Sequence, residues 1–258
     1  MNRLKSSFYI VMTLVISIAA IVLSIYTSND ARNHFVIALT PEHRSLFDQT
    51  HILSEGIKRP VKVIELENEY ELKKRIYSGE VDAYVVGSFF YIEQYSQLGG
   101  SWAVFGVPSD YYLVTLMNHE STQNRVAAFD SFMPSILIGD GSLSNVLIYD
   151  SEKRLIALSE DYVSHIIIHA SSFDPTKHQI VEKMSNRGYT EDLLILTAEW
   201  IEYDTEHNHD LIRTLSQVMT KPLDKPAESE VLSAMTYLFR NEYIPTRYYY
   251  KDLVYSIN

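Results

Sequence analysis

The sequence predicts an α/β protein in which two similar lobes with mostly parallel sheets surround a central cleft, preceded by one N-terminal transmembrane helix. Three observations lead to this prediction: a long uncharged apolar run near the N-terminus, an alternation of short apolar strands with helices, and a second round of that alternation further along the chain. The chain of 258 residues is 46% apolar and 21% charged, which is ordinary for a globular protein and enough for a sizeable core.

The charge and cysteine content exclude several classes of function. The formal net charge is −11, from 33 acidic and 22 basic residues, and the basic residues form no dense cluster. Binding to nucleic acid needs such a cluster to neutralise phosphates, so we expect no nucleic-acid partner. The chain has no cysteine, which rules out disulfides, thiolate chemistry and cysteine-containing zinc sites. We expect no cofactor and no metal.

The N-terminal segment predicts membrane insertion. Arg3 and Lys5 precede the run 8–26, whose about nineteen uncharged residues are long enough to cross about 30 Å of hydrocarbon as a helix. Basic residues before the run keep this end in the cytoplasm, so the body is expected on the extracytoplasmic side of the cell membrane. A cleaved signal peptide is the alternative, but its apolar region usually spans about 7–15 residues, and 28–31 fits a cleavage site poorly. We therefore favour an uncleaved, single-pass signal anchor.

The first half of the chain alternates predicted strands and helices. Three apolar, β-branched runs have the composition of buried strands: 34–39, 61–66 and 81–87. Pro41 ends the first strand and suits the first position of a helix over 42–56. Asn68 suits the N-cap of the next helix, which Gly79 ends, and a further helix follows the third strand. This order, with short connections, is typical of an open parallel sheet.

The second half repeats the alternation after a connection. The runs 101–108 and 110–118 are strand-like and are expected to join two lobes, and a polar break follows at 119–125. Further strands are expected at 134–140, 164–170 and 193–200. The helices expected between them span 141–158 and 173–188, the second capped by Asp174.

A repeated phrase supports two equivalent lobes. The stretch GEVDAYVVGSFFYIEQY at 79–95 returns in looser form as GYTEDLLILTAEWIEYD at 188–204. The strand starts of the two halves are also separated by about 100 to 110 residues, so we expect the second lobe to repeat the first. Coincidence stays open as an explanation, because buried βα units share composition. The expected parts are a membrane segment at 1–30, lobe 1 at 31–118, lobe 2 at 119–205, and helices packing on the lobes at 206–258.

An apolar leader followed by two α/β lobes resembles the solute-binding proteins of ABC-type importers, the periplasmic-binding-protein-like proteins of type 2. The stretch 79–95 is similar to that family's first-lobe segment, and DLLILTAEWIEY at 192–203 resembles its second-lobe segment. The group that binds nitrate, sulfonates, taurine or pyrimidine precursors is the most similar. The resemblance implies a protein that is not an enzyme, that binds a small organic solute between its lobes, and that delivers it to an ABC permease.

Candidate ligand-binding residues follow from the expected sheet, because ligands of open parallel sheets bind beyond the carboxyl ends of the strands. The residues at those ends are Thr40, Glu42, His43, Gly87, Ser88, Phe89, Asp140, Gly141, Ser142, Ser144, Ser171, Glu199 and Trp200. Gly141 and the two serines near it form either an anion cradle at a helix start or a simple helix cap. Phe89 and Trp200 are expected to be ring walls, and Glu199 to be a partner for a ligand amine.

Two further observations concern the ligand and the alternatives. Arg44 is the only basic residue near the expected strand ends, so a zwitterion or neutral heterocycle is favoured over a strongly anionic ligand. Resembling proteins with a lipid anchor carry a cysteine after the leader, which this chain lacks. One alternative is therefore a membrane-anchored accessory subunit with the same fold and no transported ligand. Another is an exported hydrolase, although the sequence contains no G-x-S-x-G or H-E-x-x-H motif.

Overall fold

The computed structural model describes most of the chain after residue 33. The described residues are 12, 17, 34–47, 50–66, 68–118, 121, 123–129, 145–149, 151–201, 205–218 and 223–255. The predicted membrane segment 8–26 lies outside the described residues except for Met12 and Ser17. Among the described residues, no helix combines the length and apolarity needed to cross a bilayer. The predicted strand 134–140 also lies outside them.

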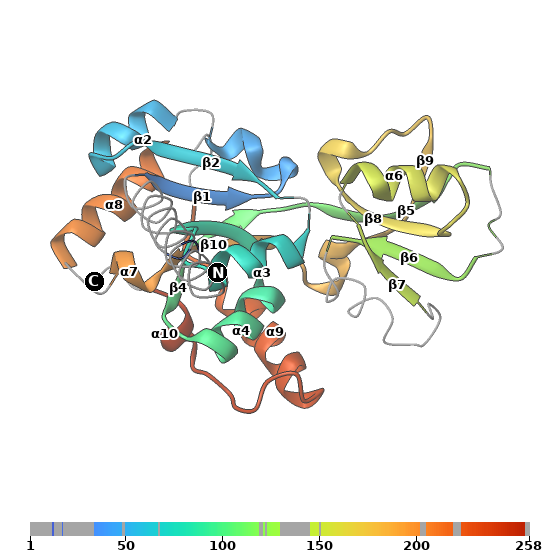
Figure 1. Cartoon of the computed structure of the whole chain (residues 1–258). Helices are drawn as coiled ribbons and strands as arrows, with labels where there is room; N and C mark the ends of the chain where they lie inside the picture. The colour runs from blue at the N-terminus through green and yellow to red at the C-terminus, as the bar shows by residue number, and fades with distance from the viewer. Residues whose placement is uncertain are drawn as a thin grey trace, which may run out of the picture.

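The described strands form two five-stranded sheets with the same layout, one in each lobe (Figure 1). The first sheet has the order β2-β1-β3-β10-β4, from β1 (Phe35–Leu39), β2 (Val61–Glu65), β3 (Ala83–Gly87), β4 (Ser101–Pro108) and β10 (Glu191–Thr197). The second has the order β7-β6-β8-β5-β9, from β5 (Tyr111–Leu116), β6 (Arg125–Ala128), β7 (Asn145–Ile148), β8 (His165–His169) and β9 (His178–Lys183). The prediction of two similar α/β lobes is confirmed.

The sheets are mixed, and the prediction that they are mostly parallel is wrong. In the first sheet, β1 pairs in parallel with β2 and β3, whereas β10 is antiparallel to both β3 and β4. The second sheet has the same pattern, with β6 parallel to β7 and β8, and β5 antiparallel to β8 and β9. The reason is that each lobe takes one central strand, β10 or β5, from a chain segment that arrives from the other lobe.

These crossing strands correct the predicted lobe boundaries. The chain passes from β4 in the first sheet directly into β5 in the second, and from β9 in the second sheet into β10 in the first. The division into 31–118 and 119–205 therefore assigns both crossing strands to the wrong lobe. It also misaligns the repeat, because β6, β7 and β8 are the counterparts of β1, β2 and β3. The two similar phrases are neighbours in one sheet, where Leu193 pairs with Val86.

Two predicted helices of the second half contain strands instead. The segment predicted as helix 173–188 contains β9 and a short 3-10 helix, η3 (Met184–Arg187). Along β9, buried or half-buried residues alternate with exposed ones, which is the strand period, and pairing with β5 overrides the helical tendency. The segment 141–158 contains β7 followed by α6 (Ser151–Ser159).

Helices cover both faces of the first sheet. They are α2 (Thr50–Ile57), α3 (Glu69–Tyr77), α4 (Ser88–Leu98), α8 (Thr205–Val218), α9 (Glu228–Arg240) and α10 (Tyr250–Leu253). Along β1, Ile37 belongs to one hydrophobic cluster and Ala38 to the other, as the alternation of side chains on a strand requires. The C-terminal helices α8 and α9 pack against α2 and α4 of the first lobe. The described contacts of the tail are thus with lobe 1.

Local signals placed several helix ends correctly. The Asn68 side chain accepts hydrogen bonds from the backbone N–H groups of Tyr70 and Glu71, at 3.0 and 3.1 Å, and so caps α3 as predicted. Gly79 follows α3 with a φ of 66°, a left-handed conformation that glycine adopts without strain. Pro41 begins a helix too, although that helix, η1 (Pro41–Phe47), is of the 3-10 type.

Candidate functional site

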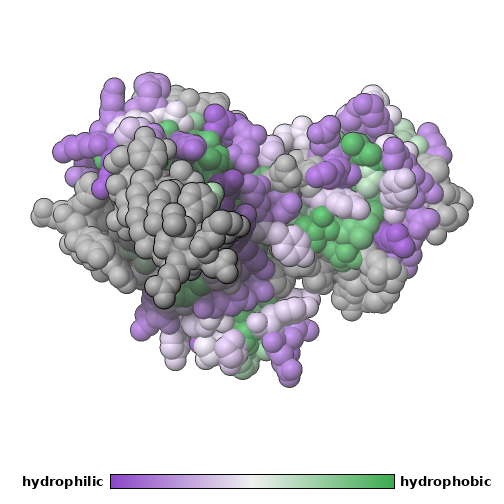
Figure 2. Space-filling model, viewed as in Figure 1, coloured by the Kyte–Doolittle hydropathy of each residue, from purple (hydrophilic) through white to green (hydrophobic). Residues whose placement is uncertain are grey.

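The two lobes meet where β1 ends and β10 begins. Because β10 is antiparallel to β3, its first residues lie at the same edge of the sheet as the carboxyl ends of β1 and β3. The residues that gather there are polar and come from both lobes: Thr40, Glu42, His43, Ser109, Tyr111, Arg154, Tyr189 and Asp192. In the space-filling view the molecule narrows between the lobes, and hydrophilic side chains lie along the first-lobe side of this waist (Figure 2).

An ion pair joins the lobes. Glu42 lies on η1 of the first lobe, and its Oε1 accepts a hydrogen bond of 3.0 Å from an Arg154 nitrogen on α6 of the second. The side chains of Glu42 and Arg154 are only 5% and 1% exposed. Arg154 also donates to the Ile167 carbonyl at 2.5 Å. Burial alone would raise the pKa of Glu42, but Arg154, the backbone and the Thr40 hydroxyl outweigh it and lower the pKa below its ordinary value.

Asp192, at the start of β10, is the centre of a second group of contacts. Its Oδ2 lies 2.9 Å from His43 Nε2 and accepts a hydrogen bond from the Tyr111 hydroxyl, also at 2.9 Å. The Tyr189 hydroxyl donates to Oδ1. Asp192 is 2% exposed, and burial favours its neutral form, but the hydrogen bond and charge of His43 and the two tyrosines prevail and lower its pKa. Asp192 is therefore held as a buried carboxylate.

His43 connects the two groups. Its Nδ1 lies 2.9 Å from the Thr40 hydroxyl oxygen, while Nε2 is shared between Asp192 and the Ser109 hydroxyl at 3.3 Å. A carboxylate only accepts hydrogen bonds, so Nε2 carries a proton toward Asp192. The Thr40 hydroxyl also hydrogen-bonds the Glu42 carboxylate and donates to it for the same reason. Through Nδ1 and the Thr40 hydroxyl on one side and Nε2 on the other, His43 lies between two carboxylates.

The contacts of His43 are also relevant to the alternative function of a hydrolase. Hydroxyl, imidazole and carboxylate do follow one another as Thr40, His43 and Asp192, which is the order of a nucleophile, a base and its orienting group. A nucleophile must be reached by its substrate, however, and Thr40, His43 and Asp192 are only 7%, 3% and 2% exposed. The geometry therefore favours a structural cluster over a catalytic one.

The end of β3 lies beside the same cluster. A Cβ at Gly87 would stand 2.3 Å from the Tyr189 hydroxyl, so only glycine lets the hydroxyl approach the strand and reach Asp192. Ser88 is fully buried, and its hydroxyl has no hydrogen-bond partner among the described residues. Phe89 packs against hydrophobic clusters of both lobes, with its ring 5.5 Å from that of Tyr237. It therefore helps to join the lobes.

The structure places Glu199 and Trp200 at the opposite end of β10 from the interlobe cluster. They lie in α7 (Ala198–Ile201), after the carboxyl end of β10, and β10 is antiparallel, so this end lies beside the amino ends of β1 and β3. Trp200 donates from Nε1 to Asp82 Oδ1 at 2.5 Å and packs edge-on against Phe35, with ring centroids 4.8 Å apart. The Glu199 side chain lies outside the described part of the structure.

The other predicted residues divide into three groups. The structure brings Thr40, Glu42 and His43 together with Gly87 and Ser88 at one sheet edge. Ser171 is exposed in η2 (Ala170–Ser172), where its hydroxyl lies 2.8 Å from His169 Nδ1. The remaining candidates lie outside the described residues: Asp140, Gly141, Ser142 and Ser144.

Sequence reasoning missed five members of the cluster: Ser109, Tyr111, Arg154, Tyr189 and Asp192. Arg154 is in the middle of a helix, and an argument limited to strand ends passes over it. Asp192 carried a usable signal, because it directly precedes the apolar run LLIL and is the second of two adjacent carboxylates. A charge there requires a buried partner or exposure at an edge.

Two carboxylates also connect the segment that leads from the second lobe into β10 with the start of α9. Glu230, at the start of α9, accepts hydrogen bonds from the Thr190 hydroxyl at 2.7 Å and from the Thr190 N–H at 3.2 Å. Glu191 accepts from the Ala227 N–H at 2.6 Å. Burial, with a smaller contribution from Glu191, raises the pKa of Glu230 to about 7.

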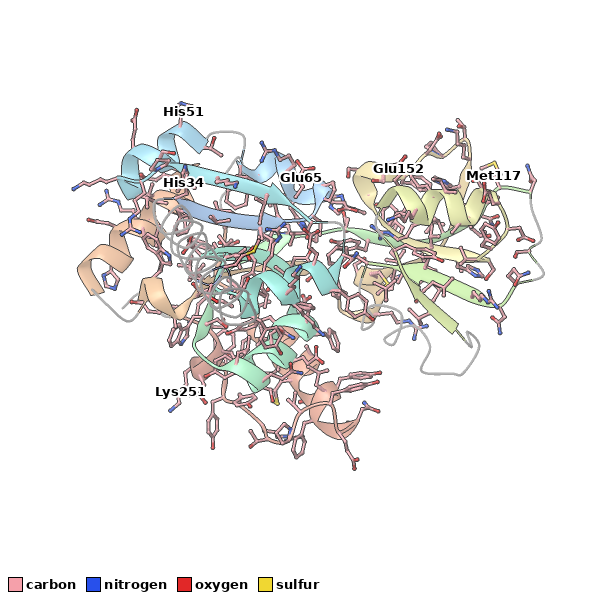
Figure 3. The ribbon with its side chains drawn as sticks, in the orientation of Figure 1. His34, His51, Glu65, Met117, Glu152 and Lys251 are labelled. Carbon is pink, nitrogen blue, oxygen red and sulfur yellow. The ribbon has the colours of Figure 1, made fainter. Side chains whose placement is uncertain are left out.

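Acidic side chains mark the outer rim between the lobes. Figure 3 shows Glu65, at the end of β2, and Glu152, at the start of α6, on opposite sides of the space between the lobes. Glu65 forms an exposed ion pair of 3.5 Å with Arg44. In contrast to the buried pair of Glu42 and Arg154, both members of this pair are about half exposed, so water screens their attraction.

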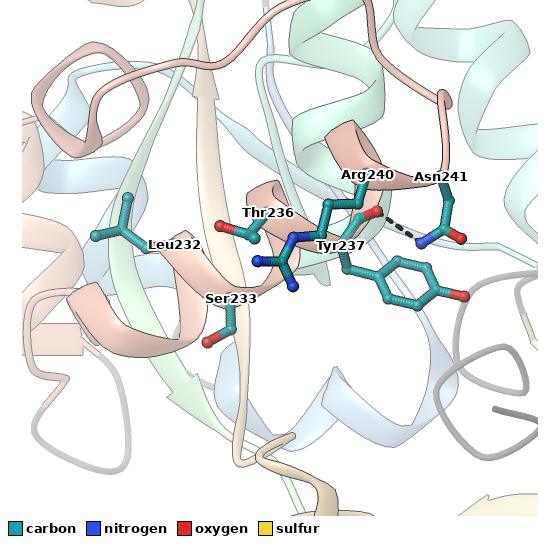
Figure 4. A pocket seen from close by; sticks show the side chains of 6 residues that line it. All are labelled: Leu232, Ser233, Thr236, Tyr237, Arg240 and Asn241. Carbon is teal, nitrogen blue, oxygen red and sulfur yellow. Dashed lines mark hydrogen bonds between the residues drawn. The ribbon is translucent and has the colours of Figure 1, made fainter.

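A cavity of about 520 Å³ lies outside the cluster, along α9 (Figure 4). Its lining residues are Leu232, Ser233, Thr236, Tyr237, Arg240 and Asn241. A smaller cavity, of about 170 Å³, is lined by Val104, Phe105, Ile212, Lys225 and Tyr255. The lining of neither cavity includes a member of the interlobe cluster.

Comparison with known proteins gives similarity in structure only. No family model and no curated protein matches the sequence. The fold is similar to the alkanesulfonate-binding protein SsuA from Xanthomonas axonopodis pv. citri bound to MOPS, with a TM-score of 0.68 and 12% identity over 86% of this chain and 98% of that one. A zinc-bound ligand-binding component of an ABC-type import system from Staphylococcus aureus gives 0.63 and 10%, over 86% and 96%.

The aliphatic sulphonate binding protein SsuA from Escherichia coli gives a TM-score of 0.57 and 11% identity, over 88% of this chain and 93% of that one. At these identities the likeness concerns the fold. The chain thus has the two-lobed, periplasmic-binding-protein-like fold of the binding components of ABC-type importers.

Proposed function

We propose that the chain is the extracytoplasmic solute-binding component of an ABC-type importer, which binds a small organic solute between its lobes and delivers it to a membrane permease. The observation that carries the proposal is the convergence of buried polar groups from both lobes on one sheet edge. Asp192 and Glu42 of the first lobe contact Tyr111 and Arg154 of the second. Residues that meet only when the lobes approach are suited to enclose a polar solute.

Such a protein works by closing on its solute. The two passages between the lobes, β4 to β5 and η3 to β10, are the natural hinge, because each is a short connection between strands of different sheets. A solute shifts the protein toward the closed form only if it binds that form more tightly than the open one. The closed form would then dock on the permease. The segment 8–26 would hold the body at the extracytoplasmic face of the cell membrane.

Isothermal titration of the full-length protein with sulfonates, amines and pyrimidines tests the proposal. At least one compound is expected to bind saturably and to reduce the radius measured by X-ray scattering. Asp192→Asn is expected to weaken this binding, whereas Glu182→Gln is the control, because Glu182 pairs with Arg187 on the surface of the second lobe. Absence of heat with every compound, together with an unchanged radius, would reject a solute receptor.

A membrane-anchored accessory subunit without a transported ligand is the second candidate. The pair of Glu42 and Arg154 favours it, because the protein's own side chains join the lobes across the position of a solute. This candidate predicts a stable complex with a membrane partner on purification and no solute binding. A purified full-length chain that binds a solute but retains no membrane partner excludes it.

A further inference from the structure

We propose that Glu42 is an internal ligand: its carboxylate occupies the anion position at Arg154 and holds the two lobes together when no solute is present. The inference rests on the proposed function in one respect, that the lobes open and close about the crossing strands. It goes further by assigning the closed, solute-free state to one side chain of the first lobe.

The group that binds the Glu42 carboxylate, Arg154, belongs to the second lobe. The Arg154 guanidinium is fixed by its bond to the Ile167 carbonyl on β8, and the side chain is 1% exposed. A backbone carbonyl orients a guanidinium but does not neutralise its charge. The Glu42 carboxylate, 3.0 Å away, is a charge partner that comes from the other lobe. Arg154 is thus an anion site that is filled by this chain.

Glu42 makes the contacts expected of a bound solute. It is anchored on the first lobe by its own backbone and by the Thr40 hydroxyl, and it pairs with a cation on the second lobe. Because it is covalently attached to the first lobe, its effective concentration at Arg154 far exceeds that of a free anion. Simple anions are therefore excluded from Arg154 in the unmodified protein, and removal of the carboxylate should admit them.

The rest of the interface is compatible with closure that needs no solute. Asp192 contacts Tyr111 from the other sheet, and Phe89 packs against the hydrophobic clusters of both lobes. Once Glu42 neutralises Arg154, the buried charges at the junction are matched. Without Glu42, the ion pair between the lobes is lost, and opening of the lobes hydrates the buried guanidinium.

The test uses the full-length protein and the substitution Glu42→Ala. Alanine removes the terminal carboxylate and the adjoining methylene, which together have the size of acetate. The variant is expected to have a larger scattering radius and a lower Tm than the unmodified protein. Sodium acetate should restore both values with a saturable dose response, whereas acetamide and equal sodium chloride should not. The unmodified protein should not respond to acetate.

Two further variants give the result its specificity. Glu42→Gln loses the charge but fills the space, so it should open like Glu42→Ala and not respond to acetate. Glu65→Ala removes the exposed partner of Arg44 on the same lobe, and should change neither the radius nor the acetate response. If Glu42→Ala does not fold, the radius of Glu42→Gln decides, and an unchanged radius overturns the inference.

An opened Glu42→Ala protein that acetate does not close also overturns it. Either negative result leaves the proposed function intact, because that proposal is tested by solute titration of the unmodified chain. Conversely, a failed solute titration combined with acetate rescue of Glu42→Ala rejects transport and retains the internal ligand.

Discussion

The two ends of β10 use a carboxylate in opposite ways. At the amino end, buried Asp192 binds His43 of its own lobe and Tyr111 of the other, so its charge connects the two lobes. At the other end, half-buried Asp82 accepts from the Trp200 indole and from the Val36 N–H, all within the first lobe. A charged contact between the lobes is expected to depend on whether they are closed. A charged contact within one lobe is expected to affect only the stability of that lobe.

Arg154→Met should produce the largest effect, because it breaks the buried ion pair and leaves the Glu42 carboxylate without its arginine partner. Breaking a buried ion pair from one side costs about 3–5 kcal/mol, and part of this is recovered if the lobes open and hydrate Glu42. We expect a lower free energy of unfolding in urea and a larger scattering radius. Arg187→Met, at the exposed pair with Glu182, is the control and should cost about 0–1 kcal/mol. Equal losses in both variants would show that the interlobe position has no special role.

Asp192→Asn should have the next largest effect. Three donors converge on the carboxylate, and hydrogen bonds to a charged group are worth about 1.5–3 kcal/mol each, although the amide retains some of them. We expect a loss of about 2–3 kcal/mol and weaker association of the lobes, seen as faster hydrogen exchange in β5 and β10. Asp82→Asn, at the other end of the sheet, should destabilise the first lobe and leave exchange in β5 unchanged. Faster exchange in β5 of Asp82→Asn would remove the distinction between the two ends.

Local signals in the sequence were sufficient for one side of the site. Thr40, Glu42 and His43 follow a buried strand and a helix-opening proline, so their place at a sheet edge depends only on neighbouring residues. Asp192 and Trp200 depend on the direction of β10, which is set by a crossing from the other lobe. The sequence pattern suggested a parallel strand, and this error exchanged the two ends of β10.

The position of Arg154 could not be predicted from the sequence, for a different reason. Its contact with Glu42 spans 112 positions in the sequence and joins a helix of one lobe to a 3-10 helix of the other. No local composition distinguishes it from a solvated helical arginine. A neutral or zwitterionic ligand was favoured because Arg44 is the only cation near the expected strand ends. Arg154, buried where the lobes meet, is a further cation that this reasoning did not include.

The pH dependence of stability should distinguish Glu230, which contacts the segment leading into β10, from the carboxylates of the interlobe cluster. The pKa of Glu230 is raised from 4.5 to about 7, so the folded protein binds more protons than the unfolded chain between these values. This contribution is complete below about pH 4.5 and is lost as the pH rises through about 7, by at most about 3 kcal/mol. The lowered pKa values of Glu42 and Asp192 act in the opposite sense, and their contribution is lost only in more acidic solution.

Urea unfolding at pH 5 and pH 8 measures this contribution. Glu230→Gln should flatten the dependence between these values, with little change in the acid limb that Glu42 and Asp192 produce. An unchanged slope would place the responsible group elsewhere, with Glu191 next, because burial raises its pKa too.

Trp200→Phe should produce the smallest effect and the sharpest contrast with Asp192. The phenyl ring keeps most of the packing against Phe35 but loses the indole hydrogen bond, while Asp82 retains its bond from the Val36 N–H. A loss of about 1 kcal/mol in the free energy of unfolding is therefore expected. The scattering radius and any solute affinity should be unchanged, because this end of β10 is remote from the junction. If Trp200→Phe alters solute affinity as much as Asp192→Asn does, the solute site cannot be confined to the edge where the lobes meet.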